Sequence, residues 1–198
     1  MSTPGRATAR PGLFGPDVPH GFHYHDAFID EREERTLLDA IGTVTFADFE
    51  MRGVVARRRV AFFGESYDRA PAGPIPDFLQ SLKRKIAAWA GYDPGEFAMA
   101  LINEYPPGAP IGWHRDAPQY ELVGGVSLLS ACRMRFRSYR PPGAGPAPVR
   151  RSTSHEISLA RRSAYLLTGD ARSRYEHHIP PVDELRYSIT FRTLRDRR

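Results

Sequence analysis

The first half of the chain contains two segments in which apolar residues recur at helical spacing. Residues 30–41 begin with Asp30, a residue type that caps helices, and Glu33 follows three positions later. Residues 77–90 show the same periodicity and end before Gly91, which is typical of a helix C-terminus. The sequence therefore predicts two amphipathic helices. Their apolar stripes are Leu37, Leu38 and Ile41 in the first helix, and Phe78, Leu82, Ile86 and Trp89 in the second.

After Gly91 the pattern changes to short apolar or alternating segments separated by Pro and Gly, which is typical of strands and turns. Many short strands that follow two helices predict a mainly β protein with flanking helices (α+β), its strands forming a sandwich or barrel. The predicted strands are 97–105, 111–116, 123–131, 133–139, 155–159, 163–168, 173–179 and 186–193, with an earlier strand or hairpin at 54–63. Residues 1–19 are predicted to be a flexible tail, and 20–198 a single domain.

The last predicted strand, RYSITFR (186–192), has two different faces. Tyr187, Ile189 and Phe191 point to one side, because successive strand residues alternate. The polar set on the other side consists of Arg186, Ser188, Thr190 and Arg192. Two interpretations remain open: a solvated face of an ordinary sandwich, or a polar pocket inside a barrel, where the two arginines reach an anion.

Composition and charge exclude several classes of protein. The single cysteine, Cys132, excludes a disulfide within the chain and a cysteine-based zinc site. No apolar run approaches the roughly 18–20 residues of a membrane helix, and the first residues lack the apolar block of a secretory signal. We therefore expect a cytoplasmic, monomeric protein without membrane association. The net charge of +5, almost entirely from arginine, suits either a solvated basic surface or a nucleic-acid partner.

One short motif carries candidate metal chemistry. His114 and Asp116 stand two residues apart near the end of a predicted strand, so both side chains can reach the same ion. A third ligand could come from His177 or His178. Two histidines and a carboxylate form the facial triad of non-heme Fe(II) oxygenases, which leaves positions for a bidentate cosubstrate and dioxygen. Trp113 faces away from His114 and is expected in the core.

Three stretches together resemble the AlkB family of Fe(II)/2-oxoglutarate dioxygenases, whose members oxidatively dealkylate nucleic acids. They are NEYPPGAPIGWHRD (103–116), YEHHIPP (175–181) and RYSITFR (186–192). The resemblance covers roughly residues 20–195 and implies a double-stranded β-helix (jelly-roll) core at about 96–195. It also implies the cofactor Fe(II), the cosubstrate 2-oxoglutarate and O2, and oxidative dealkylation of N-alkylated bases in DNA or RNA.

The same resemblance implies roles for individual residues. The iron ligands are His114, Asp116 and His177, the last because Ile179 follows it by two positions. Arg186 pairs with the distal carboxylate of 2-oxoglutarate with support from Tyr105, and a guanidinium suits a carboxylate because it binds it bidentately. Asn103 and Arg192 lie near the end of the cosubstrate that chelates the metal.

Residues 50–70 occupy the place of the family's nucleotide-recognition lid. Arg57, Arg58 and Arg59 are candidates for phosphate contacts, and alternation puts Arg58 on the face opposite the other two. The aromatic candidates for stacking on an extruded base are Phe62, Phe63 and Tyr67. A plain hairpin with core aromatics and solvated arginines is the alternative. Arg133, Arg135 and Arg137 share a strand face and form either a phosphate-binding stripe or a solvated one.

Two further functions stay open at this point. The same cofactors can act on a protein side chain or a small molecule, and the chain can be a non-catalytic nucleic-acid-binding module with a vestigial site. The complete set of His114, Asp116, His177, Arg186 and Arg192 argues against a vestigial site. The sequence does not distinguish DNA from RNA or indicate which alkyl group is removed.

Overall fold

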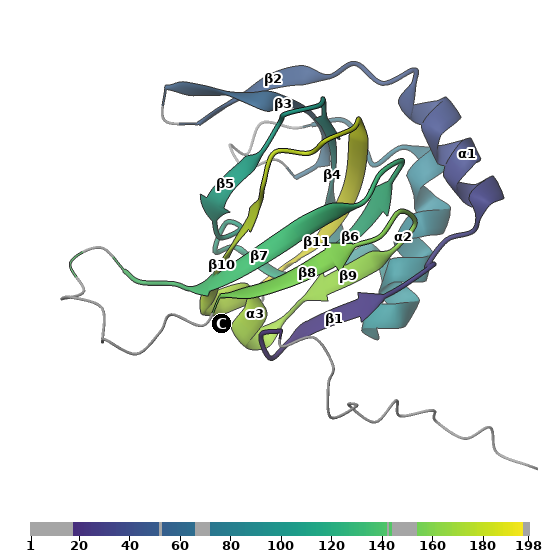
Figure 1. Cartoon of the computed structure of the whole chain (residues 1–198). Coiled ribbons are helices and arrows are strands. Elements are labelled where there is room, and N and C mark those ends of the chain that lie inside the picture. Colours follow the sequence, from purple (N-terminus) through teal and green to yellow (C-terminus); the bar gives the residue numbers. More distant parts are fainter. Residues whose placement is uncertain (1–17, 52, 66–71, 142, 144–153, 196–198) are drawn as a thin grey trace, which may run out of the picture.

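A computed structural model describes residues 18–51, 53–65, 72–141, 143 and 154–195, and it contains two antiparallel sheets. The major sheet has the strand order β1-β9-β6-β11-β4-β3-β2, and the minor sheet has the order β5-β10-β7-β8. The two sheets enclose the centre of the molecule, and helices α1 (Glu31–Ile41) and α2 (Asp77–Ala90) cover the outer face of the major sheet (Figure 1). This arrangement confirms the predicted mainly β fold with flanking helices and its double-stranded β-helix core.

The strand bounds agree with most of the sequence predictions. In the major sheet they are β1 (Phe22–His25), β2 (Ala47–Met51), β3 (Val54–Gly64), β4 (Phe97–Tyr105), β6 (Tyr120–Leu128), β9 (Ala164–Leu167) and β11 (Arg186–Leu194). In the minor sheet they are β5 (Ile111–His114), β7 (Cys132–Ser138), β8 (His155–Leu159) and β10 (Tyr175–Ile179). Short helical segments at Pro94–Glu96 (η1) and Gly169–Ser173 (α3) complete the described elements.

Both long helices form for the reasons that the sequence suggests. Asp30 and Glu33 make a reciprocal capping box at the start of α1, and Gly91 ends α2 with φ of 77°. Their apolar faces bury Leu37, Leu82 and Ile86 against the major sheet. None of the helices among the described residues is long and apolar enough to cross a membrane.

Strand β11 is buried on both faces. Ile189 and Phe191 are fully buried in the core beneath the helices. Arg186, at 0% exposure, and Arg192, at 5%, are equally buried on the other face, toward the space between the sheets. The polar face of this strand is therefore an interior pocket wall, and the solvated-sandwich interpretation is wrong.

Four of the described elements were not predicted, and one of them is the short η1 segment before β4. Strand β2 pairs with β3 as a hairpin, but its sequence ADFEM contains Asp and Glu, which rarely favour strands. Strand β1, with the sequence FHYH, extends the far edge of the major sheet beside β9. The α3 turn occupies residues 169–173, so β10 begins at Tyr175 rather than at 173. Residues 1–17 of the predicted tail lie outside the described residues.

Candidate metal centre and cosubstrate cavity

A cavity of about 640 Å³ opens between the two sheets, beneath the β2–β3 hairpin. Its size is in the range of pockets that hold small organic ligands. Its wall combines polar residues from β4, β5, β10 and β11 with aromatic and aliphatic residues. The polar and charged residues among them are Arg58, Asn103, His114, Arg115, Asp116, His177, Ser188, Thr190 and Arg192, with Asp48 and Glu50 of β2 also on the wall.

His114, Asp116 and His177 form a cluster that can hold a metal ion. Their candidate ligand atoms all lie within 4.8 Å of one another, and the two imidazole rings are 4.2 Å apart. His114 and His177 are cross-strand partners on β5 and β10, and Asp116 follows β5 directly. Two imidazoles and one carboxylate are the donor set that suits non-heme Fe(II). The predicted ligand triad is therefore assembled by the fold.

Arg192 holds the carboxylate of this cluster in place. Its Nε and Nη2 atoms donate to Asp116 Oδ1 at 3.1 and 2.8 Å, while Nη1 donates to Thr190 Oγ1 at 2.9 Å. The other oxygen, Oδ2, lies 3.7 Å from His177 Nε2. Arg192 thus contacts the metal-site carboxylate directly, a contact that the sequence did not indicate.

The electrostatics keep the cluster in the protonation state that a metal requires. Burial alone would raise the pKa of Asp116, but the positive charge of Arg192 and the two nearby histidines outweigh it, so the pKa lies below its ordinary value. Burial lowers the pKa of His114, and burial together with His114 lowers the pKa of His177 to about 3. All three groups therefore present deprotonated ligand atoms near neutral pH.

The two adjacent histidines of β10 point in opposite directions. His177 lines the cavity, whereas the ring of His178 stacks on Trp113 at 5.0 Å outside it. Trp113 faces the side opposite to His114, as alternation predicts, but this side is the outer face of the minor sheet because His114 lines the cavity. The expectation that Trp113 lies in the core is therefore wrong. The guanidinium of Arg137 lies 4.4 Å from the centre of its ring.

Arg186 is a fully buried cation at the inner end of the polar face of β11. Its Nε donates to Ser127 Oγ at 3.0 Å, and its guanidinium carbon lies 5.0 Å from the centre of the Tyr105 ring. Its Nη1 atom is buried and has no hydrogen-bond partner among the described residues. An unpartnered guanidinium nitrogen in a dry environment is costly unless a ligand carboxylate occupies it. Arg186 therefore fits the distal carboxylate of 2-oxoglutarate.

Asn103 and Arg58 form the upper polar wall of the cavity. Asn103 Oδ1 accepts from Arg58 Nε at 3.3 Å, and its Nδ2 donates to Ser188 Oγ at 3.5 Å. The Arg58 guanidinium also lies 4.1 Å from the centre of the Phe49 ring. As the alternation predicted, Arg58 is buried and faces the cavity, while Arg57 and Arg59 are exposed on the other side of β3.

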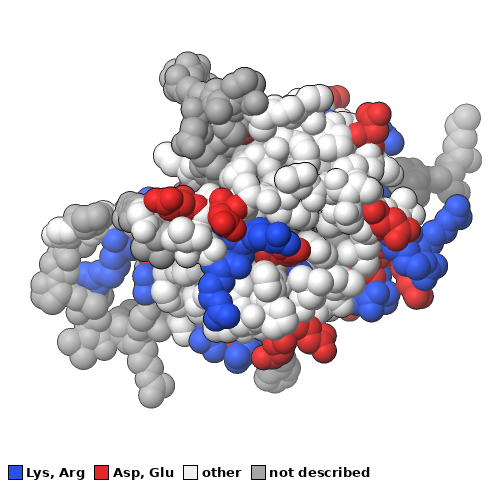
Figure 2. All heavy atoms as spheres, turned by 90° about the horizontal axis from the view of Figure 1, so that it is seen from above, with Lys and Arg blue, Asp and Glu red and all other residues white. Residues whose placement is uncertain are grey.

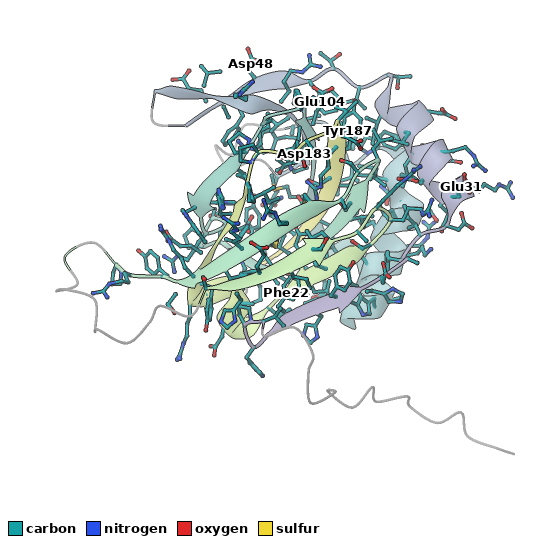
Figure 3. All side chains as sticks on the ribbon, in the orientation of Figure 1. Phe22, Glu31, Asp48, Glu104, Asp183 and Tyr187 are labelled. Atoms are coloured by element: carbon teal, nitrogen blue, oxygen red, sulfur yellow. The ribbon has the colours of Figure 1, made fainter. Side chains whose placement is uncertain are left out.

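The other candidate residues of the predicted lid lie on different sides of β3, and only some of them reach the cavity. Phe62 lines the cavity, but Phe63 packs into the core beneath the helices, so Phe63 does not reach a ligand in the cavity. Arg59 forms an ion pair with Glu104, which also accepts a hydrogen bond from Tyr187 at 3.1 Å. Figure 3 labels Glu104 and Tyr187 near each other, and Asp48 at the outer edge of the hairpin. Tyr67 lies outside the described residues.

The arginine stripe on β7 is ion-paired on the outer face of the minor sheet. Arg135 and Arg133 lie 2.5 and 3.8 Å from Glu156, and Arg137 lies 2.7 Å from Glu176. Figure 2, which views the molecule from the hairpin side, shows basic and acidic side chains interspersed rather than a continuous basic patch. The excess of arginine therefore does not by itself mark a nucleic-acid track.

The low pKa of His177 predicts how the metal-free protein responds to acid. Because the folded pKa of about 3 lies below the ordinary 6.5, the unfolded chain binds more protons between these values. We expect the free energy of unfolding to fall as pH drops from 6.5 toward 3, measured by urea denaturation. His177→Gln should flatten this decline, whereas the exposed His23→Gln should not. An equal decline in all three proteins would contradict the burial of a neutral His177.

Two contributors to the cavity gave little or no signal in the sequence. Phe49 lies on the unpredicted β2, and Tyr165 lies in the strand AYLL, which reads as ordinary core. Phe62, one of the aromatic candidates named from the sequence, lines the cavity, and alternation from Arg58 puts Val60 and Phe62 on that side.

Comparisons with known proteins agree with this geometry. The sequence model of the 2OG-Fe(II) oxygenase superfamily matches residues 51–192. An "Alkylated DNA repair protein ALKBH8 homolog" of Arabidopsis thaliana is 24% identical over 191 residues, covering 85% of this chain and 54% of the relative. The "Probable RNA/DNA demethylase ALKBH6" of Danio rerio is 28% identical over 175 residues, covering 85% of this chain and 73% of the relative.

A third relative is much longer than this chain. The mouse "tRNA (carboxymethyluridine(34)-5-O)-methyltransferase ALKBH8" is 27% identical over 177 residues, which is 83% of this chain but 25% of the relative. The chain thus spans about half the length of the Arabidopsis protein and a quarter of the mouse protein.

Solved structures show the fold alone. The structure of OsALKBH1 matches with a TM-score of 0.62 at 15% identity, covering 89% of this chain and 99% of that one. A prolyl hydroxylase from Trichoplax adhaerens, in complex with a peptide of hypoxia inducible factor, matches with a TM-score of 0.60 at 15% identity, covering 88% and 83%.

Proposed function

Since this chain belongs to the 2OG-Fe(II) oxygenase superfamily, we propose that it oxidatively dealkylates N-alkylated bases in DNA or RNA. The observation that carries the proposal is the metal cluster in a cavity whose upper wall holds Phe49, Phe62 and Arg58. Flat aromatic and guanidinium groups suit a nucleobase that has been turned out of its strand. Distant relatives with the names quoted above, which refer to alkylated DNA repair and to RNA/DNA demethylation, add support.

The chain's own residues have distinct tasks in this reaction. His114, Asp116 and His177 would hold Fe(II), and Arg186 and Tyr105 would orient 2-oxoglutarate. Together with dioxygen, these groups supply oxidation of a substrate C–H bond. Arg192 fixes the orientation of Asp116, and the β2–β3 hairpin shields the reacting end of the cavity from water. Asn103 joins Arg58 to the polar floor through its two hydrogen bonds.

Product analysis tests the proposal directly. The protein is incubated with Fe(II), 2-oxoglutarate and a panel of N-methylated DNA and RNA oligonucleotides. Mass spectrometry then measures the masses of the product oligonucleotides. We expect loss of the methyl group from at least one oligonucleotide, with succinate formed above the rate seen with its unmethylated counterpart. If succinate forms but no methylated oligonucleotide stimulates it or loses its methyl group, the substrate belongs to another class. Absence of any succinate would contradict the enzyme assignment itself.

We expect Arg57 and Arg59, on the exposed side of β3, to contact the phosphate backbone of the substrate. Oligonucleotide affinity should then weaken as salt rises, and each lost phosphate contact should lower the log–log slope by roughly 0.7–0.9. Arg57→Ala is the cleaner variant, because Arg59 also pairs with Glu104. Arg84→Ala, an exposed arginine on α2, is the control of equal charge. Equal slopes for Arg57→Ala, Arg84→Ala and the unchanged protein would show that Arg57 makes no phosphate contact.

A further inference from the structure

Three hydrogen-bond donors near the polar face of β11 have no hydrogen-bond partner among the described residues. One is the buried Nη1 atom of Arg186, and the others are the hydroxyl groups of Tyr105 and Tyr165, which both line the cavity. Within the described part of the chain, neither hydroxyl has a hydrogen-bond partner. Both tyrosines line the cavity although they are only 2% and 6% exposed. Buried donors that lack internal partners indicate a place where a ligand acceptor is expected.

The position of Tyr165 follows from a glycine on the neighbouring strand. Tyr165 of β9 is the cross-strand partner of Gly125 on β6, and Gly125 in turn pairs with Thr190 on β11. A Cβ atom on Gly125 would lie 2.4 Å from the ring of Tyr165 and 2.6 Å from its hydroxyl oxygen. The tyrosine ring therefore lies directly over the glycine and extends across β6 toward β11, which carries both buried arginines.

The electrostatic surroundings keep Tyr165 a donor. Burial is the main reason that its pKa is raised, and the nearby carboxylate of Asp116 adds to the effect. The charges of Arg186 and Arg192 also act on this hydroxyl, although they do not reverse the rise. The hydroxyl thus stays protonated and is available as a hydrogen-bond donor to a ligand in the cavity.

Arg186 and Arg192 differ in how many of their hydrogen-bond donors are already paired within the protein. Arg192 uses its guanidinium on Asp116 and Thr190, so the metal end of the cavity already has a paired charge. Arg186 has the neutral Ser127 as its side-chain hydrogen-bond partner. A carboxylate has about four acceptor positions and, when buried, requires several donors at once. The Arg186 end is therefore where a ligand anion gains most from a further hydroxyl group.

We propose that Tyr165 donates a hydrogen bond to the distal carboxylate of 2-oxoglutarate, beside Arg186 and Tyr105. The proposal rests on the cosubstrate of the family and not on the nature of the substrate that is oxidised. It makes Tyr165 a determinant of selectivity for a 2-oxo acid with a second carboxylate. Gly125 then has a positioning role, because any side chain there would displace the ring.

Direct binding to the Mn(II)-loaded protein without dioxygen tests this role, since Mn(II) accepts the same ligands as Fe(II) without supporting turnover. Calorimetry compares 2-oxoglutarate with 2-oxopentanoate, which has the same chain length but lacks the distal carboxylate. Tyr165→Phe keeps the ring and removes the hydroxyl. We expect it to raise the Kd of 2-oxoglutarate about tenfold or more, the usual effect of losing a hydrogen bond to a charged group. The Kd of 2-oxopentanoate should not change.

Two further variants make the result decisive. Tyr175→Phe, on β10 away from the cavity wall, is the matched control and should leave both Kd values unchanged. Gly125→Ala retains the hydroxyl but forces the ring to move, and it should also weaken 2-oxoglutarate selectively. Unchanged 2-oxoglutarate binding in Tyr165→Phe, or an equal loss for both ligands, would overturn the proposal. Binding is measured without nucleic acid, so failure of the dealkylation proposal would leave this result intact.

Discussion

Asp116→Ala is expected to abolish 2-oxoglutarate turnover and also to lower the free energy of unfolding of the metal-free protein. Turnover is lost because the anionic member of the metal cluster is gone. Stability falls because Arg192, 5% exposed, loses the carboxylate to which two of its nitrogens donate. Removing one partner of a buried ion pair costs about 3–5 kcal/mol. Succinate formation and urea denaturation near neutral pH measure the two effects.

Two comparisons separate these effects. Asp116→Asn keeps an oxygen acceptor for Arg192 but loses the charge, so it should be equally inactive and lose less stability. Asp170→Ala removes an exposed carboxylate of α3 that lies 3.3 Å from Arg174, and both properties should stay nearly unchanged. Because the pKa of Asp116 lies below the ordinary 3.8, its contribution is present above that pH and is lost as the solution becomes more acidic. Native turnover by Asp116→Ala would refute its place in the metal site.

The parts of this site that could be predicted from sequence are those that depend on local alternation. A His-x-Asp pair near a strand end and the two faces of residues 186–192 follow from the two-residue repeat of a strand. The alternation also separated Arg58 from Arg57 and Arg59 correctly. It did not decide whether the polar face of β11 met water or the interior, because that depends on the second sheet packed opposite.

The parts that sequence could not predict depend on contacts between distant segments. Arg192 and Asp116 are 76 residues apart, and no periodic pattern relates them. Trp113 lies on the side opposite to His114, as alternation indicated, but the interior cavity is on the His114 side, so Trp113 faces outward. Strand β2 was not predicted because it contains Asp and Glu, which are unfavourable in strands. Its pairing with β3 stabilises it as a strand. The polar role of Tyr165 depends on the small size of Gly125, a cross-strand neighbour.

Glu34 is the clearest case of a residue whose role is invisible in the sequence. It lies in the acidic first turns of α1, where a solvent-facing position would be the ordinary expectation, yet it is 0% exposed. Its carboxylate accepts from Leu129 N at 2.9 Å and from Arg161 Nε at 2.8 Å, and Arg162 lies 3.6 Å away. Leu129 and Arg162 both have positive φ, at 69° and 66°, and stand in the turns that follow β6 and β8. Glu34 therefore joins the first helix to two strained turns.

Glu34→Ala is accordingly expected to lower the free energy of unfolding by about 2–4 kcal/mol, since it removes hydrogen bonds to a charged group and leaves the Leu129 N–H without its acceptor. Glu31→Ala is the matched control on the same helix. Glu31 points outward in Figure 3 and forms an exposed pair with Arg35, and such pairs contribute little. Urea denaturation of both variants provides the measurement. Metal and 2-oxoglutarate binding below the unfolding transition should stay unchanged, because Glu34 is not part of the cavity wall.

A double-mutant cycle with Arg161→Ala then identifies the cause of the loss. Arg161 is 45% exposed at its side chain, so water can solvate it when Glu34 is removed. The reverse change leaves a fully buried carboxylate with only the Leu129 N–H and the more distant Arg162 as partners, and it should also lower the free energy of unfolding. The double variant should therefore be more stable than the sum of the two losses implies, with a coupling energy of about 1–3 kcal/mol. Strict additivity would mean that Glu34 and Arg161 do not stabilise each other, and that Glu34 acts through the Leu129 turn.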